Sequence, residues 1–164
     1  MQDRYAGDVG DFGKFGLLRH LCGETAGDSH THLKPGVIWY KVPDEAHNAD
    51  GKFIEYLDES EENDLRFRAC DENLYEALRD VVSAERLIKA LERKQLLPSA
   101  LYSGRPVPQW KKEVSDTRSG WFAEALAETA HSNLVFLDPD NGIGRADMRP
   151  TQRKILQEIG RAHV

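Results

Sequence analysis

The sequence predicts an α/β fold with an open, mostly parallel sheet and flanking helices. Two observations lead to this prediction. Apolar runs at 37–42, 100–102 and 134–137 have the length of β-strands, and segments with helical spacing of apolar residues separate them. Strands that alternate with helices are typical of a parallel sheet. Three strands are few for a doubly wound sheet, so we expect the sheet to be incomplete at the C-terminus.

The N-terminal half is predicted to contain a helix, a strand and a short second helix. Residues 11–22 repeat apolar side chains at helical spacing and end before Gly23, a typical helix stop. The run 37–42 is rich in β-branched and aromatic residues and ends at a proline, which predicts a strand. Residues 51–57 predict a short helix, and the acidic run 58–64 predicts a solvated loop or helix face.

The C-terminal half is predicted to alternate helices with two strands. Residues 73–97 carry two helical patterns that divide near Ser83. A short strand follows, and then an amphipathic helix at 121–130 whose first two residues, both aromatic, are expected in the core. The apolar run 134–137 predicts a buried strand, and a last helix is predicted from Thr151.

Length and composition predict a single domain over residues 1–157. The 164 residues are 40% hydrophobic and 30% charged, with a formal net charge of -6. This acidic balance does not indicate a nucleic-acid binder, although a local basic cleft is compatible with it. Cys22 and Cys70 lack metal-ligand spacing, so neither a disulfide framework nor a zinc site is expected. We recognise no signal peptide or membrane span, which favours a cytoplasmic location without a membrane partner; the oligomeric state is not predicted.

The last seven residues, 158–164, are expected to be foreign to the natural protein. They can be back-translated as GAG ATC GGA AGA GCA CAC GTC, which is the start of a common sequencing-library adapter. We therefore expect read-through from a library fragment, with the natural protein continuing past residue 157. A true helix end that shares these codons is the alternative.

Polar residues follow the last predicted strand. The run 134–137 ends on Asp138, Pro139, Asp140 and Asn141. Ligands bind at the carboxyl ends of strands in open α/β sheets, so two carboxylates and an amide placed there are candidates to contact a ligand, a metal or a reacting amine. The alternative is a sharp turn, in which Asp138 only caps the backbone that follows.

The N-terminal segment is rich in glycine and carries a lysine in the first turn of its helix. Gly7 is one of four glycines within ten residues, which allow the backbone to approach a ligand closely. Asp8 or Asp11 is expected to cap the helix. Lys14 opposes the helix dipole, so a bound carboxylate or phosphate is one reason for its position, and a solvent-facing lysine is the alternative.

Four segments agree in order with those of a known family. They are Ala6-Gly7 with Asp11 and Lys14, the strand 37–42 with its acidic exit Asp44-Glu45, Leu101 to Pro106, and Leu137 to Asn141. In this order they resemble the bacterial 23S rRNA adenine-N6 methyltransferases. That family has a histidine-alanine-glycine-asparagine opening, a strand with an acidic exit, a Tyr-Pro-Gly-Ser-Pro segment and an Asp-Pro-Pro-Tyr strand end. The chain is also similar to an uncharacterised bacterial family that shares this opening and a Leu-Asp-Pro-Asp-Asn-Gly strand end.

The resemblance implies a Rossmann-like methyltransferase sheet that binds S-adenosylmethionine (SAM). It implies that Asp138 and Pro139 hold the acceptor amine, orienting its lone pair toward the methyl group, and that Asp140 and Asn141 lie at the same acceptor site. It also implies that Lys14 meets the carboxylate of SAM. The residues that it assigns to the cofactor are Gly7, Asp11, Lys14, Asp44 and Glu45.

Two departures from that family bear on the substrate and on the cofactor. Asp140-Asn141 stand where the family has proline and a tyrosine that stacks on the flipped base, which argues against adenine N6 as the acceptor. A nucleic-acid substrate or another amine acceptor therefore stays open. The loop 43–51 keeps Gly51 but lacks the glycine-rich turn that wraps SAM in the family.

Two other classes of function compete with the methyltransferase. In a metal-dependent phosphodiesterase or nuclease, Asp138 and Asp140 would hold Mg²⁺ with Asp44 or Glu45. A separate candidate is a divalent metal site at His47 beside Asp44, Glu45 and Asp50, for which an ordinary polar loop is the simpler interpretation. The other class is a non-catalytic partner protein that keeps the methyltransferase fold and has lost the SAM loop. Basic and aromatic side chains that are candidates for phosphate and base contacts, or for an ordinary surface loop, are Arg105, Trp110, Lys111 and Lys112.

Overall fold

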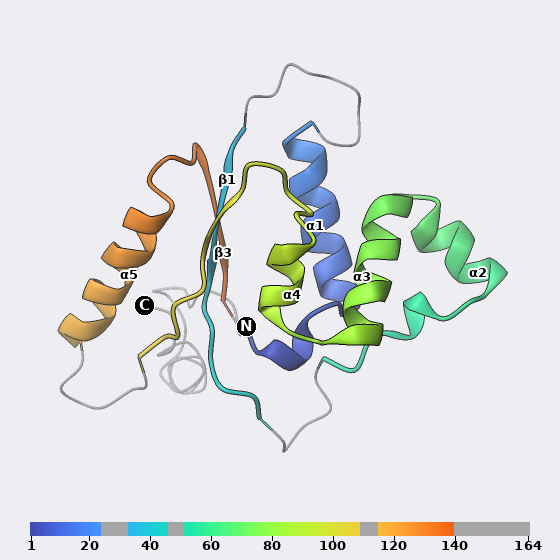
Figure 1. The fold of residues 1–164 in the computed structure, drawn as a ribbon, viewed down its shortest axis with the longest axis horizontal. Helices are drawn as coiled ribbons and strands as arrows, with labels where there is room; N and C mark the ends of the chain where they lie inside the picture. Colours follow the sequence, from blue (N-terminus) through green and yellow to red (C-terminus); the bar gives the residue numbers. More distant parts are fainter. Residues whose placement is uncertain (24–32, 46–50, 109–114, 140–164) are drawn as a thin grey trace, which may run out of the picture. The chain divides into compact units, whose positions relative to one another are not determined.

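The computed structural model describes residues 1–23, 33–45, 51–108 and 115–139 (Figure 1). The chain divides into two compact units. The sheet unit comprises Met1, Gly36–Val42 and the chain from Leu101 onward, and the helical unit comprises Gln2–Pro35 and Pro43–Ala100. The predicted mixed α/β fold is confirmed, and a single domain over 1–157 stays a prediction.

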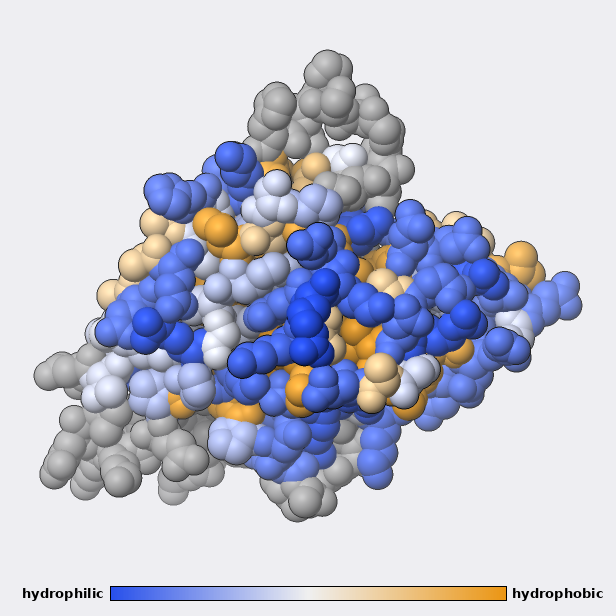
Figure 2. Space-filling model, in the orientation of Figure 1, coloured by the Kyte–Doolittle hydropathy of each residue, from blue (hydrophilic) through white to orange (hydrophobic). Residues whose placement is uncertain are grey.

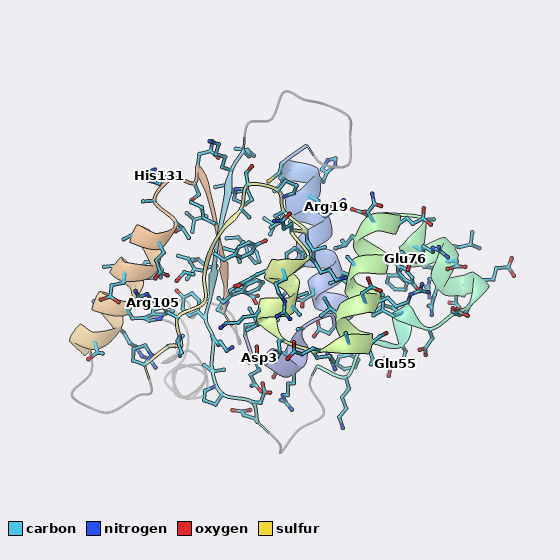
Figure 3. All side chains as sticks on the ribbon, viewed as in Figure 1. Asp3, Arg19, Glu55, Glu76, Arg105 and His131 are labelled. Carbon is cyan, nitrogen blue, oxygen red and sulfur yellow. The ribbon has the colours of Figure 1, made fainter. Side chains whose placement is uncertain are left out.

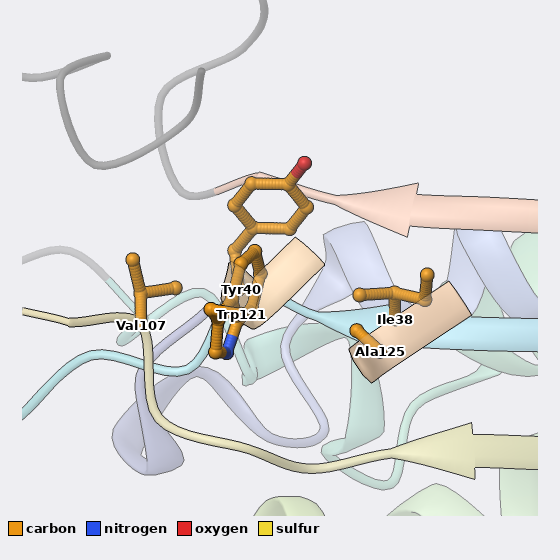
Figure 4. Close-up of a cluster of buried hydrophobic side chains, with 5 residues drawn as sticks. All are labelled: Ile38, Tyr40, Val107, Trp121 and Ala125. Atoms are coloured by element: carbon orange, nitrogen blue, oxygen red, sulfur yellow. The ribbon is translucent and has the colours of Figure 1, made fainter. Parts of the chain in front are cut away.

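The sheet unit contains a three-stranded parallel sheet. Its strands β1 (Pro35–Trp39), β2 (Leu101–Ser103) and β3 (Leu134–Asp138) lie in the order β2-β1-β3. β1 and β2 are parallel, and the arrows of β2 and β3 point the same way in Figure 4. All five residues of β1 are buried, as expected for a central parallel strand. The predicted parallel sheet is therefore confirmed for these strands.

Helix α5 (Ser115–Glu128) packs on one face of this sheet (Figure 4). It begins at Ser115 rather than at the predicted residue 121, so Trp121 lies inside the helix and is buried. The core that it closes consists of Ile38, Tyr40, Val107, Trp121 and Ala125. Trp39 points to the opposite face, where its ring stacks on Tyr102 with 6.3 Å between centroids. This alternation follows from the two-residue period of strands.

The helical unit is built on α1 (Val9–Leu21) and α3 (Glu72–Ala84), which pack together. The other elements are η1 (Asp3–Tyr5), η2 (Glu55–Leu57), α2 (Glu61–Asn63), η3 (Asp64–Arg68) and α4 (Ile88–Arg93). The two predicted helices within 73–97 are confirmed as α3 and α4. The predicted short helix over 51–57 is wrong at its start, because only Glu55–Leu57 is helical.

An aromatic group fills the space between α1, η2, η3 and α3. The ring of Tyr56 lies 5.6 Å from that of Phe12 and 5.2 Å from that of Phe67, and it meets Tyr75 edge-on at 6.2 Å. Such tilted and edge-on pairs are favoured over face-to-face contact. The group explains how short helices with little intrinsic stability are held in place.

Hydrophilic side chains cover much of the visible surface, with separate hydrophobic patches between them (Figure 2). Among the residues that the structure describes, no helix is long and apolar enough to cross a membrane. The helix predicted from Thr151 and the suspected adapter segment 158–164 lie outside the described residues.

Candidate functional site

The strand order of the sheet reverses at β1. The chain passes from β1 to β2 on one side and then returns to β3 on the other side of β1. Such a reversal is the position at which open α/β sheets bind ligands, beyond the carboxyl ends of the two strands that flank it. Asp138 is the last residue of β3, and Tyr40 directly follows β1. Because β1 and β3 are parallel, both residues lie at this edge.

The side chains at this edge are well packed. Asp138 is 7% exposed, and Tyr40 is buried with its ring 5.0 Å from that of Trp121 in an edge-on contact (Figure 4). Burial raises the pKa of Tyr40 above its ordinary value, and the hydroxyl is protonated at neutral pH in either case. Beyond β1, the Val107 N–H donates to the Lys41 carbonyl (2.8 Å) and continues the pairing. The edge therefore holds the side chain of Asp138 and a neutral phenol, both nearly buried.

Pro139 follows Asp138 directly, while Asp140 and Asn141 lie outside the described residues. Proline disfavours helical geometry for the residue before it, and Asp138 is in fact extended. The structure therefore describes two of the four predicted acceptor residues, Asp138 and Pro139.

The N-terminal segment folds around a buried carboxylate. Asp8, and not Asp11, caps α1: its Oδ1 accepts the Asp11 N–H (3.0 Å). Asp11 turns inward and is fully buried, with Oδ2 accepting the Gly7 N–H (2.9 Å) and Oδ1 lying 2.7 Å from Lys14 Nζ. Gly7 has φ +82°, and a Cβ there would lie 2.5 Å from Val82 Cγ2. Three of the predicted cofactor residues, Gly7, Asp11 and Lys14, are therefore brought together.

Burial sets the electrostatics of this segment. Burial raises the pKa of Asp11 to about 6, against the lowering effect of the Lys14 ammonium. The Tyr56 hydroxyl donates to the Gly7 carbonyl (3.1 Å), and burial together with the charges of Asp11 and Asp8 raises the pKa of Tyr56. Lys14 thus has an internal anion, Asp11, and 29% of its side chain remains exposed.

The two acids that leave β1 lie against the start of the chain. The Arg4 N–H donates to Asp44 Oδ1 (3.2 Å), and the Glu45 N–H donates to Gln2 Oε1 (2.9 Å). Gln2 is fully buried, and its Oε1 also accepts from Arg4 Nε (2.7 Å). Asp44 and Glu45 themselves are exposed. They are therefore held beside the first residues of the chain, and their predicted convergence with the segment 5–14 and Asp138 stays a prediction.

Arg86 also contacts the N-terminal segment of the helical unit, and it was not predicted. Its Nε donates to the Ala6 carbonyl (3.0 Å) and its Nη2 to the Gly51 carbonyl (2.7 Å). Gly51 has φ +76°, and a Cβ there would clash with the Tyr5 ring. Arg86 has no motif around it, since it lies between two predicted helices. It ties the glycine turn to the far end of the loop that follows β1.

Asp138 and Pro139 belong to the sheet unit, whereas Gly7, Asp11 and Lys14 belong to the helical unit. The expected convergence of these two groups on one cleft therefore stays a prediction.

No family model matches the chain. Neither a curated protein nor a solved structure matches it. The resemblance to the rRNA methyltransferases thus rests on the residues themselves.

The residues suggested for metal or phosphate binding are only partly described. Among the described residues, no three histidine, cysteine or acidic side chains are grouped so as to hold a metal ion. His47 and Asp50 of the candidate metal site, and Asp140 of the phosphodiesterase or nuclease alternative, lie outside the described residues. Arg105 pairs with Glu124 (2.7 Å) and Glu128 on α5 (Figure 3), so its charge is balanced within the sheet unit. Trp110 and the two lysines after it also lie outside the described residues.

Proposed function

We propose that the protein is a SAM-dependent methyltransferase-like enzyme that acts on an amine acceptor. The observation that carries the proposal is the position of Asp138 at the carboxyl end of β3, where the strand order of a parallel sheet reverses. The resemblance to the rRNA methyltransferases supplies the reaction class.

Asp138 and Pro139 are proposed to bind the acceptor. A carboxylate accepts hydrogen bonds from an amine and thereby orients the lone pair of the amine nitrogen toward the methyl group of SAM. This is a positioning role. Asp138 suits this role because its backbone is fixed in β3 and its carboxylate is held at the end of a packed edge. The acceptor is a nucleic-acid base or another amine.

Lys14 and the segments around it are proposed to bind SAM. The exposed part of the Lys14 side chain can pair with the carboxylate of SAM. Asp44 and Glu45 are exposed acids that follow the first strand, where carboxylates accept hydrogen bonds from ribose hydroxyls in nucleotide-binding sheets. The turn at Gly7 allows close approach of the backbone because a side chain would collide there.

Isothermal calorimetry with SAM tests the cofactor assignment. We expect saturable binding that Lys14→Ala weakens by about 1–3 kcal/mol, the scale of a charge-assisted hydrogen bond. Lys94→Ala is the matched control, because Lys94 is also paired with an aspartate, Asp80, at 2.8 Å in the same unit. Binding of Mg²⁺ without binding of SAM would instead support the metal-dependent alternative.

Methyl transfer tests the acceptor assignment. With tritium-labelled SAM and bacterial ribosomal RNA as the probe, Asp138→Asn should lower incorporation ~100-fold and leave SAM affinity unchanged, because a misplaced acceptor loses orientation and not cofactor binding. Glu124→Gln, an exposed acid of the same unit, is the control. Equal incorporation by Asp138→Asn and the wild type would contradict the role of Asp138.

A further inference from the structure

The fully buried carboxylate of Asp11 depends on a partly exposed cation for its charge. No part of the Asp11 side chain is exposed, whereas the side chain of Lys14, whose Nζ lies 2.7 Å away, is 29% exposed. The other carboxylate oxygen accepts the Gly7 N–H. A buried ionised carboxylate is stable only while it is paired and hydrogen-bonded. Asp11 therefore relies on a lysine that a ligand can reach.

The surrounding groups add little positive charge at Asp11. From its own segment, Asp8 contributes a negative charge that disfavours ionisation of Asp11. In η2, the Tyr56 hydroxyl donates to the Gly7 carbonyl, and the Tyr56 ring meets that of Tyr75 in α3 edge-on. The Arg86 guanidinium, which follows α3, donates to the Ala6 and Gly51 carbonyls. The charge state of Asp11 thus follows the position of the Lys14 ammonium.

We propose that Asp11 and Lys14 form a proton-controlled latch on the N-terminal segment. When Asp11 takes up a proton from solvent, its carboxyl becomes neutral and Lys14 is released from the ion pair. Conversely, when an anion binds the Lys14 ammonium, the buried Asp11 carboxylate loses its counter-charge. Asp11 then takes up a proton from solvent. Ligand binding and proton uptake are therefore linked, and each favours the other to the same extent. Only the identity of the anion, the SAM carboxylate, rests on the proposed function.

The Gly7 amide reports the latch in the absence of any ligand, because its N–H donates to Asp11. In a ¹⁵N–¹H titration, we expect the Gly7 resonance to shift with a midpoint near pH 6. Lys14→Met should move the midpoint to higher pH, and Asp11→Asn should abolish the transition. Asp8→Asn is the matched control, since it removes a neighbouring carboxylate and should keep the transition at a slightly lower pH.

Two results would overturn the latch. One is a Gly7 resonance that does not titrate between about pH 4.5 and about pH 7.5 in the wild type, a window that brackets the carboxyl transition. The other is a midpoint that Lys14→Met leaves unchanged. If Asp11→Asn does not fold, as circular dichroism will show, the Lys14→Met result alone decides.

Proton uptake tests the ligand side of the latch. Calorimetry of SAM binding near pH 7 in two buffers of different ionisation enthalpy counts the protons exchanged. We expect uptake approaching one proton per SAM in the wild type and none in Asp11→Asn. SAM binding without uptake would overturn the linkage. Absence of SAM binding would contradict the proposed function, and the Gly7 titration would then decide the latch by itself.

Discussion

The guanidinium of Arg19 in α1, a residue labelled in Figure 3, holds Asp71, which caps α3. Arg19 Nε lies 2.7 Å from Asp71 Oδ2, and Asp71 Oδ1 accepts the Leu74 N–H at 3.0 Å. Arg19 Nη1 also donates to the Leu96 carbonyl (2.9 Å). Both side chains of the ion pair are only 10% exposed. One pair therefore joins α1, the start of α3 and the segment after α4.

Arg19→Ala should destabilise the protein strongly. Removing one partner of a buried pair leaves the other charge without compensation, which costs about 3–5 kcal/mol. Urea unfolding measures the loss. Arg66→Ala is the control, because Arg66 pairs with Glu62 on the surface, where their side chains are 69% and 73% exposed. That change should cost less than about 0.5 kcal/mol. Equal losses for the two variants would contradict a structural role for the Arg19–Asp71 pair.

Asp11 should make stability depend on pH in the direction opposite to that of an ordinary paired carboxylate. Its pKa in the folded protein is raised from the ordinary 3.8 to about 6. Its contribution to the free energy of unfolding is therefore complete below about pH 4 and is lost as the pH rises through about 6. The difference between these two pKa values corresponds to about 3 kcal/mol in the free energy of unfolding.

Comparison with Asp11→Asn isolates this contribution, since the other carboxylates titrate in both proteins. The stability of the wild type minus that of Asp11→Asn should decrease between about pH 4 and about pH 7. A difference that stays constant, or that increases with pH, would show that Asp11 is not held in a raised-pKa environment.

Gly36→Ala should weaken the contact between β1 and the turn that follows α5. A Cβ at Gly36 would lie 2.5 Å from Ser132 Oγ and 2.8 Å from Thr129 Cβ, and Thr129 is buried and cannot move aside easily. We expect a loss of about 1–3 kcal/mol in thermal or urea unfolding, the usual cost of overpacking. Gly120 is a helical position where an added Cβ would meet no other described part of the chain within 4 Å, so Gly120→Ala should make the protein slightly more stable. Similar effects at both positions would argue against the close contact.

The sequence predicted the elements that have strong apolar periodicity. β1 and β3 contain apolar runs, and α3 repeats Leu74, Leu78 and Val81 on one buried side. The prediction that the run 134–137 is buried is wrong, because its residues are at least partly exposed and Val135 is 43% exposed. The elements that it missed lack such a signal. η1 is held by tertiary contact, since Asp3 Oδ1 accepts the Ile88 N–H (3.0 Å). The first turns of α5 are mainly polar, so the pattern was recognised only from Trp121 onward.

The candidate site was predictable in its residues and less so in its contacts. The glycine-rich opening and Lys14 were predicted to act together, and they do lie together. That Asp11 turns inward to pair with Lys14 was not predicted, because Asp8 and Asp11 are equally plausible caps from spacing alone. Gln2 and Arg86 contact backbone carbonyls and amides of distant segments, and no local pattern reports such contacts.

Chemical-shift mapping of the ¹⁵N-labelled protein with SAM tests the central claim most directly. Asp138 closes β3 at the edge where the strand order reverses, and Lys14 lies in the segment proposed for the cofactor. We predict that SAM shifts the amide resonances of Gly7 to Lys14. The convergence predicted from the sequence adds those of Lys41, Val42 and Asp138 in the sheet unit. Shifts confined to α2 and α4, or no shifts at saturating SAM, would contradict a SAM site at the carboxyl edge of this sheet.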